Sequence, residues 1–322
     1  MCYSAQIWAD YRRYVREFGA LLDIKEFYDL FWRRKSDSKI KIPKAMEAGF
    51  AEPASDIERE IKALIGEFTA GQELKLQQEL FKQKKRLADA ERSLESKTTK
   101  KAEEDKRIAT SKISWAMDKL SDLHRSELVD EDARIFPQHY APVMVMQDGK
   151  RVVRPMRFHC RPEGKPAFYD VKYPGLYNAR RDSLDKFWKG LWGYRHGIIV
   201  ANAFYENVNK HRAEGRELRE GEAVENVVLE FKPRTTQDML LACLWSDWKG
   251  LGKESDLLSF ALITDEPPEE VAAAGHDRCV IPIKPEHVDA WLSPDPNNLD
   301  AMQAIFDLRA RPYYENRWLM AA

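Results

Sequence analysis

Two patterns of apolar positions divide the chain near residue 130. From about residue 135 to the end, short apolar runs are separated by proline, glycine and charged residues. Most runs have the length of a strand and are rich in β-branched or aromatic residues, as in APVMVM, GIIVANAFYEN and LLSFALIT. Helical spacing interrupts them at about 183–191, 285–291 and 298–307. This half is therefore predicted to be a β-rich domain of the α+β class.

The first fifty residues show helical spacing in two places. The first helix is predicted from apolar residues at Tyr11, Val15, Phe18, Leu21 and Leu22. A second helix is predicted around 27–31, and residues 36–54, with Pro43, Gly49 and Pro53, are predicted to be a connector. The segment 55–58 then has the form of a helix start, with a capping Ser55 and acidic residues in the first turn.

Between about 71 and 128, Lys, Glu, Gln, Arg and Ala dominate, and neither Gly nor Pro follows Gly71. This pattern predicts an antiparallel helical hairpin or short coiled coil with its turn near 97–101. The chain is thus divided into one domain of residues 1–50 and 130–322 and a helical insertion of residues 51–129. Apolar residues recur with heptad spacing at Leu80, Leu87 and Leu94 and, after a polar break, at Ile113 and Leu120.

Composition narrows the class of protein. The formal net charge of −1 does not indicate nucleic-acid binding by bulk charge, so such binding needs a local basic patch. The four cysteines are widely spaced without a C-x-x-C pair, which indicates neither a disulfide framework nor a metal site, and no cofactor is predicted. No apolar run has the length of a membrane span or of a signal peptide. We expect a cytoplasmic protein, associated with the nucleoid if it is bacterial.

The first candidate reactive residue along the chain is Cys2. Removal of Met1 would leave Cys2 with an α-amine beside a thiol, both partly in reactive form near neutral pH. An amine and a thiol so placed convert an aldehyde into a Schiff base and then a five-membered thiazolidine. A cysteine at position 2 is common by chance, so its importance depends on the rest of the chain.

Three segments of the β-rich half carry further candidate groups. Asn178 offers a donor and an acceptor, and Arg180 offers a fork for phosphate or carboxylate. Glu206 follows an apolar strand, where a raised pKa would allow it to move protons. His276 lies in the segment GHDRC before another apolar strand. Taken singly, each has a structural alternative: an asparagine at a helix entry, a salt-bridged glutamate and a loop histidine.

The order of these motifs resembles one known family. An N-terminal cysteine is followed by N-A-R at 178–180, F-Y-E at 204–206 and H-D-R at 276–278. This order resembles the SRAP family, the SOS-response-associated peptidases, which include sensors of abasic DNA. The resemblance covers the first few residues and about 135–320 and does not extend to about 50–130. It implies a barrel-like core of mixed or antiparallel sheets.

The resemblance also implies a function and a set of roles. Cys2 would link covalently to the ring-opened aldehyde of an abasic site in single-stranded DNA, through a thiazolidine, and so protect the lesion in a DNA-damage response. Asn178 would orient the terminal amine or the sugar oxygen, Glu206 would carry protons, and His276 would help to open the deoxyribose ring. No metal takes part. Two arginines would hold the phosphates that flank the lesion, Arg180 and Arg278.

The chain departs from the family pattern beside these motifs, and other functions stay open. Tyr3 and Ser4 stand where the family has Gly and Arg, and Asn207 stands where it has Trp. One alternative is an N-terminal-cysteine hydrolase, either a peptidase that removes its own Met1 or an amidase that acts on another substrate, with Cys2, Glu206 and Asn178 serving acyl transfer. Another is a non-catalytic interaction protein that acts through the hairpin of 71–128, by binding a protein partner or by self-association.

Overall fold

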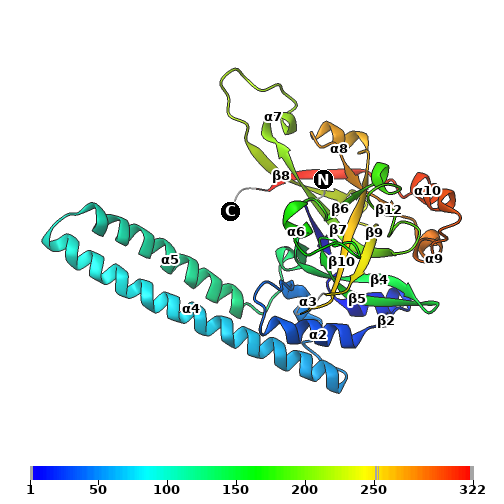
Figure 1. Ribbon diagram of the computed structural model, residues 1–322. Coiled ribbons are helices and arrows are strands. Elements are labelled where there is room, and N and C mark those ends of the chain that lie inside the picture. The colour runs from blue at the N-terminus through cyan, green and yellow to red at the C-terminus, as the bar shows by residue number, and fades with distance from the viewer. Residues whose placement is uncertain (1–2, 251, 253, 320–322) are drawn as a thin grey trace.

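The computed structural model describes residues 3–250, 252 and 254–319, and its centre is a sheet that closes into a barrel (Figure 1). β7 pairs with both β4 and β9, β10 pairs with both β5 and β9, and β4 pairs with β5. The ring is thus complete, and of its pairings only β10–β5 is parallel. The predicted α+β class and barrel-like core are confirmed. The five strands are β4 (Tyr140–Gln147), β5 (Lys150–Phe158), β7 (His196–Asn209), β9 (Met239–Trp248) and β10 (Leu257–Asp265).

Shorter or peripheral strands extend the barrel. The first strand is held between β3 and β7, and β8 joins the far end of β7 to β13. β6 lies parallel to the end of β10, while β11 runs antiparallel to the same end. β2 pairs with β5 and β12 with β9. Their bounds are β1 (Ser4–Ile7), β2 (Leu21–Leu22), β3 (Arg134–Ile135), β6 (Asn178–Arg180), β8 (Asn226–Pro233), β11 (Cys279–Val280), β12 (Pro282–Ile283) and β13 (Tyr314–Leu319).

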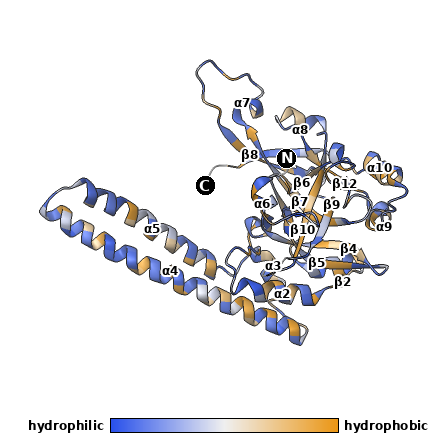
Figure 2. Ribbon diagram, viewed as in Figure 1, coloured by the Kyte–Doolittle hydropathy of each residue, from blue (hydrophilic) through white to orange (hydrophobic). Residues whose placement is uncertain are grey.

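Aromatic pairs fill the core of the barrel, where the strands are mainly apolar (Figure 2). The rings of Phe204 and Phe231 stack with their centroids 5.0 Å apart, and those of Phe158 and Phe260 lie 5.2 Å apart. All four side chains are fully buried. Burial of one such side chain contributes about 1.5–3 kcal/mol, so the apolar runs seen in the sequence supply the main driving force for this domain.

The N-terminal helices differ from the predicted ones in one respect. α1 (Tyr11–Phe18) begins at an Asp10 cap and ends at Gly19, whose φ of 61° is left-handed. The predicted continuation of this helix to Leu22 is wrong, because the chain reverses at Gly19 and enters β2. α2 (Ile24–Arg34) is confirmed, and the predicted connector contains one short helix, α3 (Lys44–Ala48).

The helical hairpin consists of α4 (Asp56–Ser96) and α5 (Lys100–His124), and it projects away from the barrel (Figure 1). The predicted start is confirmed, because the Ser55 side chain accepts a hydrogen bond from the backbone N–H of Glu58. Arg86 pairs with Asp105 at 2.6 Å, and Lys112 with Glu79 at 3.6 Å, as antiparallel helices require. The turn falls within the predicted segment.

Alanine, rather than leucine, occupies the buried centre of this hairpin. The three heptad leucines, Leu80, Leu87 and Leu94, are only half-buried. A pair of helices has no third partner to cover their outer edges, so long side chains beside the contact stay partly in solvent. The buried positions also repeat with a period of seven, at Gln83 and Ala90 in α4 and at Ala102, Ala109 and Ala116 in α5.

Three predicted helical segments of the second half have different outcomes. α9 (Val288–Leu292) and α10 (Leu299–Asp307) confirm two of them, with Asn298 as the cap of α10. The third is wrong: after the 3-10 turn Arg181–Ser183, residues 184–194 form successive turns rather than an α-helix. Gly190 and Gly193, the latter with a φ of 83°, break any regular repeat there. The other short helices are α6 (Tyr169–Lys172), α7 (Lys210–Ala213) and α8 (Glu269–Ala273).

The base of the hairpin is attached firmly to the N-terminal helices. Glu58 accepts hydrogen bonds from Tyr11 and Arg12, and Ile61 and Leu64 of α4 are buried. Beyond this base, the helices contact mainly each other. Among the described residues, no helix combines the length and apolar character that crossing a bilayer requires.

Candidate functional site

Glu206 lies inside β7 rather than at the end of a strand. The strand continues for three residues beyond it, to Asn209, and Glu206 faces Leu229 of β8 across the pair. Its side chain has no exposed surface. A carboxyl group placed among apolar neighbours in a central strand is costly unless it keeps its proton or finds partners. The sequence prediction of a strand-end glutamate is therefore wrong in position, although its expected raised pKa is met.

His276 provides the nearest titratable partner. It occupies the turn between α8 and β11, and its Nε2 atom lies 3.2 Å from Oε2 of Glu206. On the other side of the ring, Nδ1 lies 2.8 Å from the carbonyl oxygen of Arg278 and 3.3 Å from the N–H of the same residue. The shorter contact requires a proton on Nδ1. In the neutral ring, Nε2 is then the acceptor that faces Glu206.

Burial shifts the two pKa values in opposite directions. It raises the pKa of Glu206 to about 8, because the carboxylate would lose its hydration. The same loss of hydration lowers the pKa of His276. Near neutral pH these shifts favour the uncharged form of both groups, with the Glu206 carboxyl group 3.2 Å from Nε2 of His276. Release of the Glu206 proton leaves a buried carboxylate, so the raised pKa drives the group to recover a proton.

The described chain begins beside this pair. The N–H of Tyr3 donates to the carbonyl oxygen of Tyr205 at 3.1 Å, and Ser4 is directly opposite Tyr205 in the sheet. The backbone of Tyr3 also partly offsets the effect of burial on the Glu206 pKa. The predicted nucleophile, Cys2, precedes Tyr3 in the sequence and lies outside the described residues.

The remaining cysteines are poor nucleophiles. Cys160, Cys243 and Cys279 are buried without disulfide bonds. Burial raises the pKa of the Cys160 thiol to about 12 and raises those of the other two as well. Thiolate chemistry near neutral pH is thus disfavoured at all three positions. Within the described parts of the chain, no cluster of three or more His, Cys, Asp or Glu side chains could hold a metal ion.

The predicted N-A-R and H-D-R segments meet at the end of β10. Asn178 pairs with Leu262, and Arg180 pairs with Thr264, which is also opposite Val280 of β11. Because β6 and β11 flank the same residue, they bring Arg180 and Arg278 to one edge of the barrel. Asn178 is buried at the start of β6 rather than at a helix entry, and the segment that follows this strand forms a 3-10 turn and further turns instead of the predicted helix.

Asp182, which sequence analysis did not single out, connects the two predicted DNA-binding arginines. Its carboxylate lies 2.6 Å from Arg180 and 3.7 Å from Arg278. Hydrogen bonding from Arg180 lowers the pKa of this exposed carboxyl group. Both cations are therefore partly neutralised in the described structure. The position of Asp182 directly after N-A-R-R gave no signal, because acidic residues are frequent at exposed turns.

The three residues that depart from the family pattern differ in burial and in their contacts. Ser4 is fully buried and accepts a hydrogen bond from Nε of Arg134 at 2.9 Å. The ring of Tyr3 packs edge-on against Phe136, with centroids 5.7 Å apart. Asn207 is exposed, next to the buried Glu206. Sequence analysis also missed Arg134, because it lies over a hundred residues away from the strand that it contacts.

A cavity of about 770 Å³ opens beside His276. Its lining comes from the turn of 275–277 and from the arm between β7 and β8, including Arg212. Gly275, with a φ of 91°, packs so closely on the arm that a Cβ atom there would lie 2.7 Å from Arg212. This close approach requires glycine and fixes the turn that carries His276.

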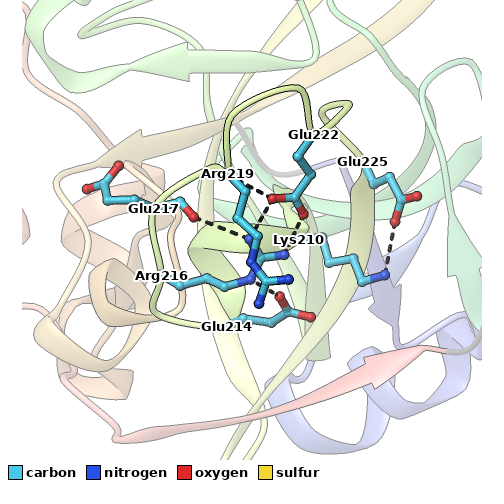
Figure 3. A network of polar contacts seen from close by, with 7 residues as sticks. All are labelled: Lys210, Glu214, Arg216, Glu217, Arg219, Glu222 and Glu225. Carbon is cyan, nitrogen blue, oxygen red and sulfur yellow. Dashed lines mark hydrogen bonds and ion pairs between the residues drawn. The ribbon is translucent and has the colours of Figure 1, made fainter.

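Ion pairs hold that arm together (Figure 3). Arg216 forms a two-pronged contact with Glu222, at 2.6 and 2.8 Å, and also contacts Glu214 at 2.6 Å. Lys210 pairs with Glu225 at 2.9 Å, which joins the two ends of the arm. The loop that forms the outer wall of the cavity is therefore held together by ion pairs.

Comparisons with solved structures find similar but distant chains. A protein from Bordetella bronchiseptica is 16% identical, with a TM-score of 0.46, over 61% of this chain and 90% of its own. A protein from Bacteroides thetaiotaomicron is 11% identical, with a TM-score of 0.44, over 58% and 77%. A phage-related protein from B. bronchiseptica is 16% identical, with a TM-score of 0.42, over 58% and 81%. No functionally curated protein matches the chain.

A match to a protein-family model identifies the family of this chain. The model of the SOS response associated peptidases, SRAP, matches residues 95–318, which is more than half of the chain. The match contains the N-A-R, F-Y-E and H-D-R motifs and ends within β13. The chain therefore belongs to the SRAP family, which is associated with the DNA-damage response and with the sensing of abasic sites.

Proposed function

We propose that this protein captures abasic sites in single-stranded DNA covalently through Cys2, after removal of Met1. The observation that carries the proposal is the Glu206–His276 pair, whose atoms lie 3.2 Å apart beside the start of the described chain. An aldehyde trap needs an amine, a thiol and a proton carrier. The N-terminal cysteine supplies the first two groups, and the buried pair supplies the third.

The reaction joins the aldehyde to Cys2 with loss of one water. The α-amine attacks the carbonyl carbon, the C–O π bond breaks, and the oxygen gains a proton. Glu206 then protonates the hydroxyl group of this carbinolamine, which leaves as water while a C=N bond forms. The thiol sulfur adds to the carbon of that bond, and its proton ends on the nitrogen. Glu206 recovers the proton lost by the amine, so the pair is unchanged at the end.

The other predicted residues have supporting roles in this proposal. His276 faces the Glu206 carboxyl group through Nε2 and helps to open the deoxyribose ring by relaying the Glu206 proton to the ring oxygen, which leaves Glu206 as the carboxylate until it recovers a proton. Asn178, at the start of β6, orients the amine or the sugar oxygen. The cavity beside His276 provides room for the opened sugar.

Arg180 and Arg278 hold phosphates on either side of the lesion. Each is partly neutralised by Asp182 in the absence of DNA, so a phosphate would compete with this carboxylate. Binding of this kind is independent of sequence and weakens with salt. Single-stranded DNA that contains an abasic site is thus the proposed partner, with the damaged chromosome as the place of action.

A denaturing gel tests the covalent step. Wild-type protein incubated with abasic single-stranded DNA should give an adduct that survives denaturation, whereas Cys2→Ala should give none. Cys2→Ser is the matched control, because it keeps the amine but lacks the thiol. It should give a Schiff base that is trapped only when borohydride is added. Equal adduct yields from wild type and Cys2→Ala would contradict the proposal.

The same pair could also serve a peptidase reaction on the chain itself. Removal of Met1 requires a proton carrier close to the first peptide bond, and Glu206 lies beside the start of the described chain. Intact-mass measurement of wild type and Glu206→Gln tests this second function. Retention of Met1 in the variant alone supports it, and identical masses contradict it.

The helical insertion has an accessory role in this proposal. We assign residues 1–50 and 130–322 to the catalytic domain and 51–129 to the insertion. The outer surface of the hairpin exposes Phe81, at 77%, together with Leu74 and Met117. Exposed apolar side chains of this size favour a protein partner or a second copy of the chain over solvent alone.

A further inference from the structure

Arg134 is held beside the first strand in an unusual environment. Its Nε atom donates to the Ser4 hydroxyl at 2.9 Å. The guanidinium carbon lies 3.7 Å from the centre of the Tyr205 ring and 4.8 Å from that of Phe136. One hydrogen bond and two ring contacts thus fix the position of the guanidinium. The two terminal nitrogens, which form the fork of an arginine, are not needed for this.

Among the described residues, no carboxylate forms an ion pair with Arg134, although Glu230 and Glu131 lie close enough to favour its charged form. Glu230 has partners of its own: it accepts a hydrogen bond from Tyr205 at 2.9 Å. Glu230 is also paired with Arg317 and with Lys232. Burial lowers the pKa of Arg134, which reflects the cost of removing this cation from water. An arginine fixed by a serine and two rings, and not ion-paired with a described carboxylate, is prepared to bind an anion.

We propose that Arg134 binds a backbone phosphate of the single strand, next to the nucleotide held at Cys2. This inference rests on the proposed function and adds a residue to its binding site. The chain between Ser4 and Cys2 spans at most ~7 Å, which places Arg134 within about one nucleotide of the reacting group. Ser4, which replaces the arginine of the family pattern, thereby serves to position an arginine from β3.

The surroundings of Arg134 suit a nucleic-acid strand. Tyr3 and Phe136, which are partly exposed, provide aromatic rings beside Arg134, and bases stack on such rings irrespective of sequence. The two terminal nitrogens of Arg134 can contact one phosphate with both prongs. A lysine would supply the charge but could neither donate to Ser4 in this geometry nor stack as a plane.

The test measures equilibrium binding of undamaged single-stranded DNA at several salt concentrations. Loss of one phosphate contact lowers the slope of log K against log salt by about 0.7, so Arg134→Gln should show that decrease. It should also bind about tenfold more weakly at physiological salt. Arg134→Lys should keep the salt slope and lose part of the affinity. An unchanged slope and affinity in Arg134→Gln would overturn the proposal, as would failure of the wild type to bind single-stranded DNA.

A matched control is available in Arg13. Its guanidinium also lies over a ring, 3.5 Å from the centre of Trp8, but it is paired with Asp238 at 3.4 Å. Arg13→Gln should leave binding and its salt slope unchanged, and equal losses in both variants would contradict a specific role for Arg134. Because the DNA in this test has no aldehyde, its result is independent of adduct formation. A wild type that binds through Arg134 but forms no adduct would refute only the proposed covalent function.

Discussion

Glu206 and His276 form a buried pair in which burial favours the uncharged form of both members. Their side chains are 3.2 Å apart, and Glu206 has no exposed surface while His276 retains 8%. Loss of hydration raises the pKa of the carboxyl group and lowers that of the imidazole. A surface pair of the same residues would be a carboxylate and an imidazolium at mildly acidic pH. Here the proton stays on Glu206 until a reaction requires it.

The rate of adduct formation should have a bell-shaped dependence on pH. The α-amine must be unprotonated to attack, so the rate falls below about pH 8, the ordinary pKa of such a group. Glu206 must be protonated to release water, so the rate also falls as the pH rises through its pKa of about 8. Single-turnover rates with abasic DNA between pH 5.5 and 10 give this profile.

Glu206→Gln separates the two limbs of that profile. The amide keeps the shape of the side chain and a donor toward Nε2 of His276, but it cannot release a proton. The maximum rate should fall by about 100-fold or more, in line with loss of a general acid. The alkaline limb should disappear while the acidic limb stays. An alkaline limb that persists in Glu206→Gln would show that another group, such as the Cys2 thiol, is responsible for it.

Protein stability should also depend on Glu206 at alkaline pH. The folded-state pKa of about 8 is raised above the ordinary value of 4.5, so the contribution of Glu206 is fully present below about pH 4.5. It is lost as the pH rises through 8, because the folded protein must then hold a buried charge. The loss is on the order of 5 kcal/mol at most, from about 1.4 kcal/mol per pKa unit over the difference between 4.5 and about 8. Thermal melting at pH 6 and 9.5 should therefore show a decrease for the wild type that is smaller in Glu206→Gln. Parallel decreases in both proteins would contradict the assigned pKa.

Asp182→Asn should strengthen DNA binding. The carboxylate of Asp182 lies 2.6 Å from Arg180 and 3.7 Å from Arg278, and its removal frees both cations for phosphate. Asp182 is exposed, so protein stability should change by less than about 1 kcal/mol. We expect severalfold tighter binding of single-stranded DNA at low salt, with the advantage shrinking as salt increases. The exposed Asp185→Asn is the control for the change in net charge, and an equal gain in both variants would argue against a specific release of the two arginines.

The apolar pattern predicted most strands because each barrel strand is a separate run bounded by turn residues. The runs APVMVM and LLSFALIT lie within β4 and β10, for example. Periodicity failed where a backbone feature ended or distorted an element, as at Gly19 and in the turns of 184–194. It also failed in the hairpin, where spacing predicted two helices but could not tell that alanines occupy the centre.

The candidate site was predictable only in part, for a related reason. Glu206 and His276 were identified from their motifs, and the structure brings them into contact. Arg134 and Asp182 were not, because their importance comes from pairings across the sheet and at the end of β10. Neither residue lies in a segment with unusual composition. Contacts between distant segments depend on strand register, and spacing along the chain carries little information about it.

The hairpin offers a way to separate the barrel from the insertion. Glu79 and Lys112 face each other across the two helices, with their charged atoms 3.6 Å apart. Residues 80–111 can therefore be replaced by a short Gly-Ser linker that joins these two turns. The base of the hairpin keeps Ile61 and Leu64 in the core and keeps the contacts of Glu58 with Tyr11.

This shortened protein should fold and form adducts at the wild-type rate. The removed part contacts mainly itself, so its loss should leave the unfolding temperature of the barrel within a few degrees of the wild type. Ile61→Asp in the full chain is the contrasting variant, because it places a charge in the core at the base and should destabilise the barrel by several kcal/mol. Circular dichroism melting and the abasic-DNA gel provide both measurements. Loss of adduct formation in a folded, shortened protein would instead assign the hairpin a direct part in holding the DNA strand.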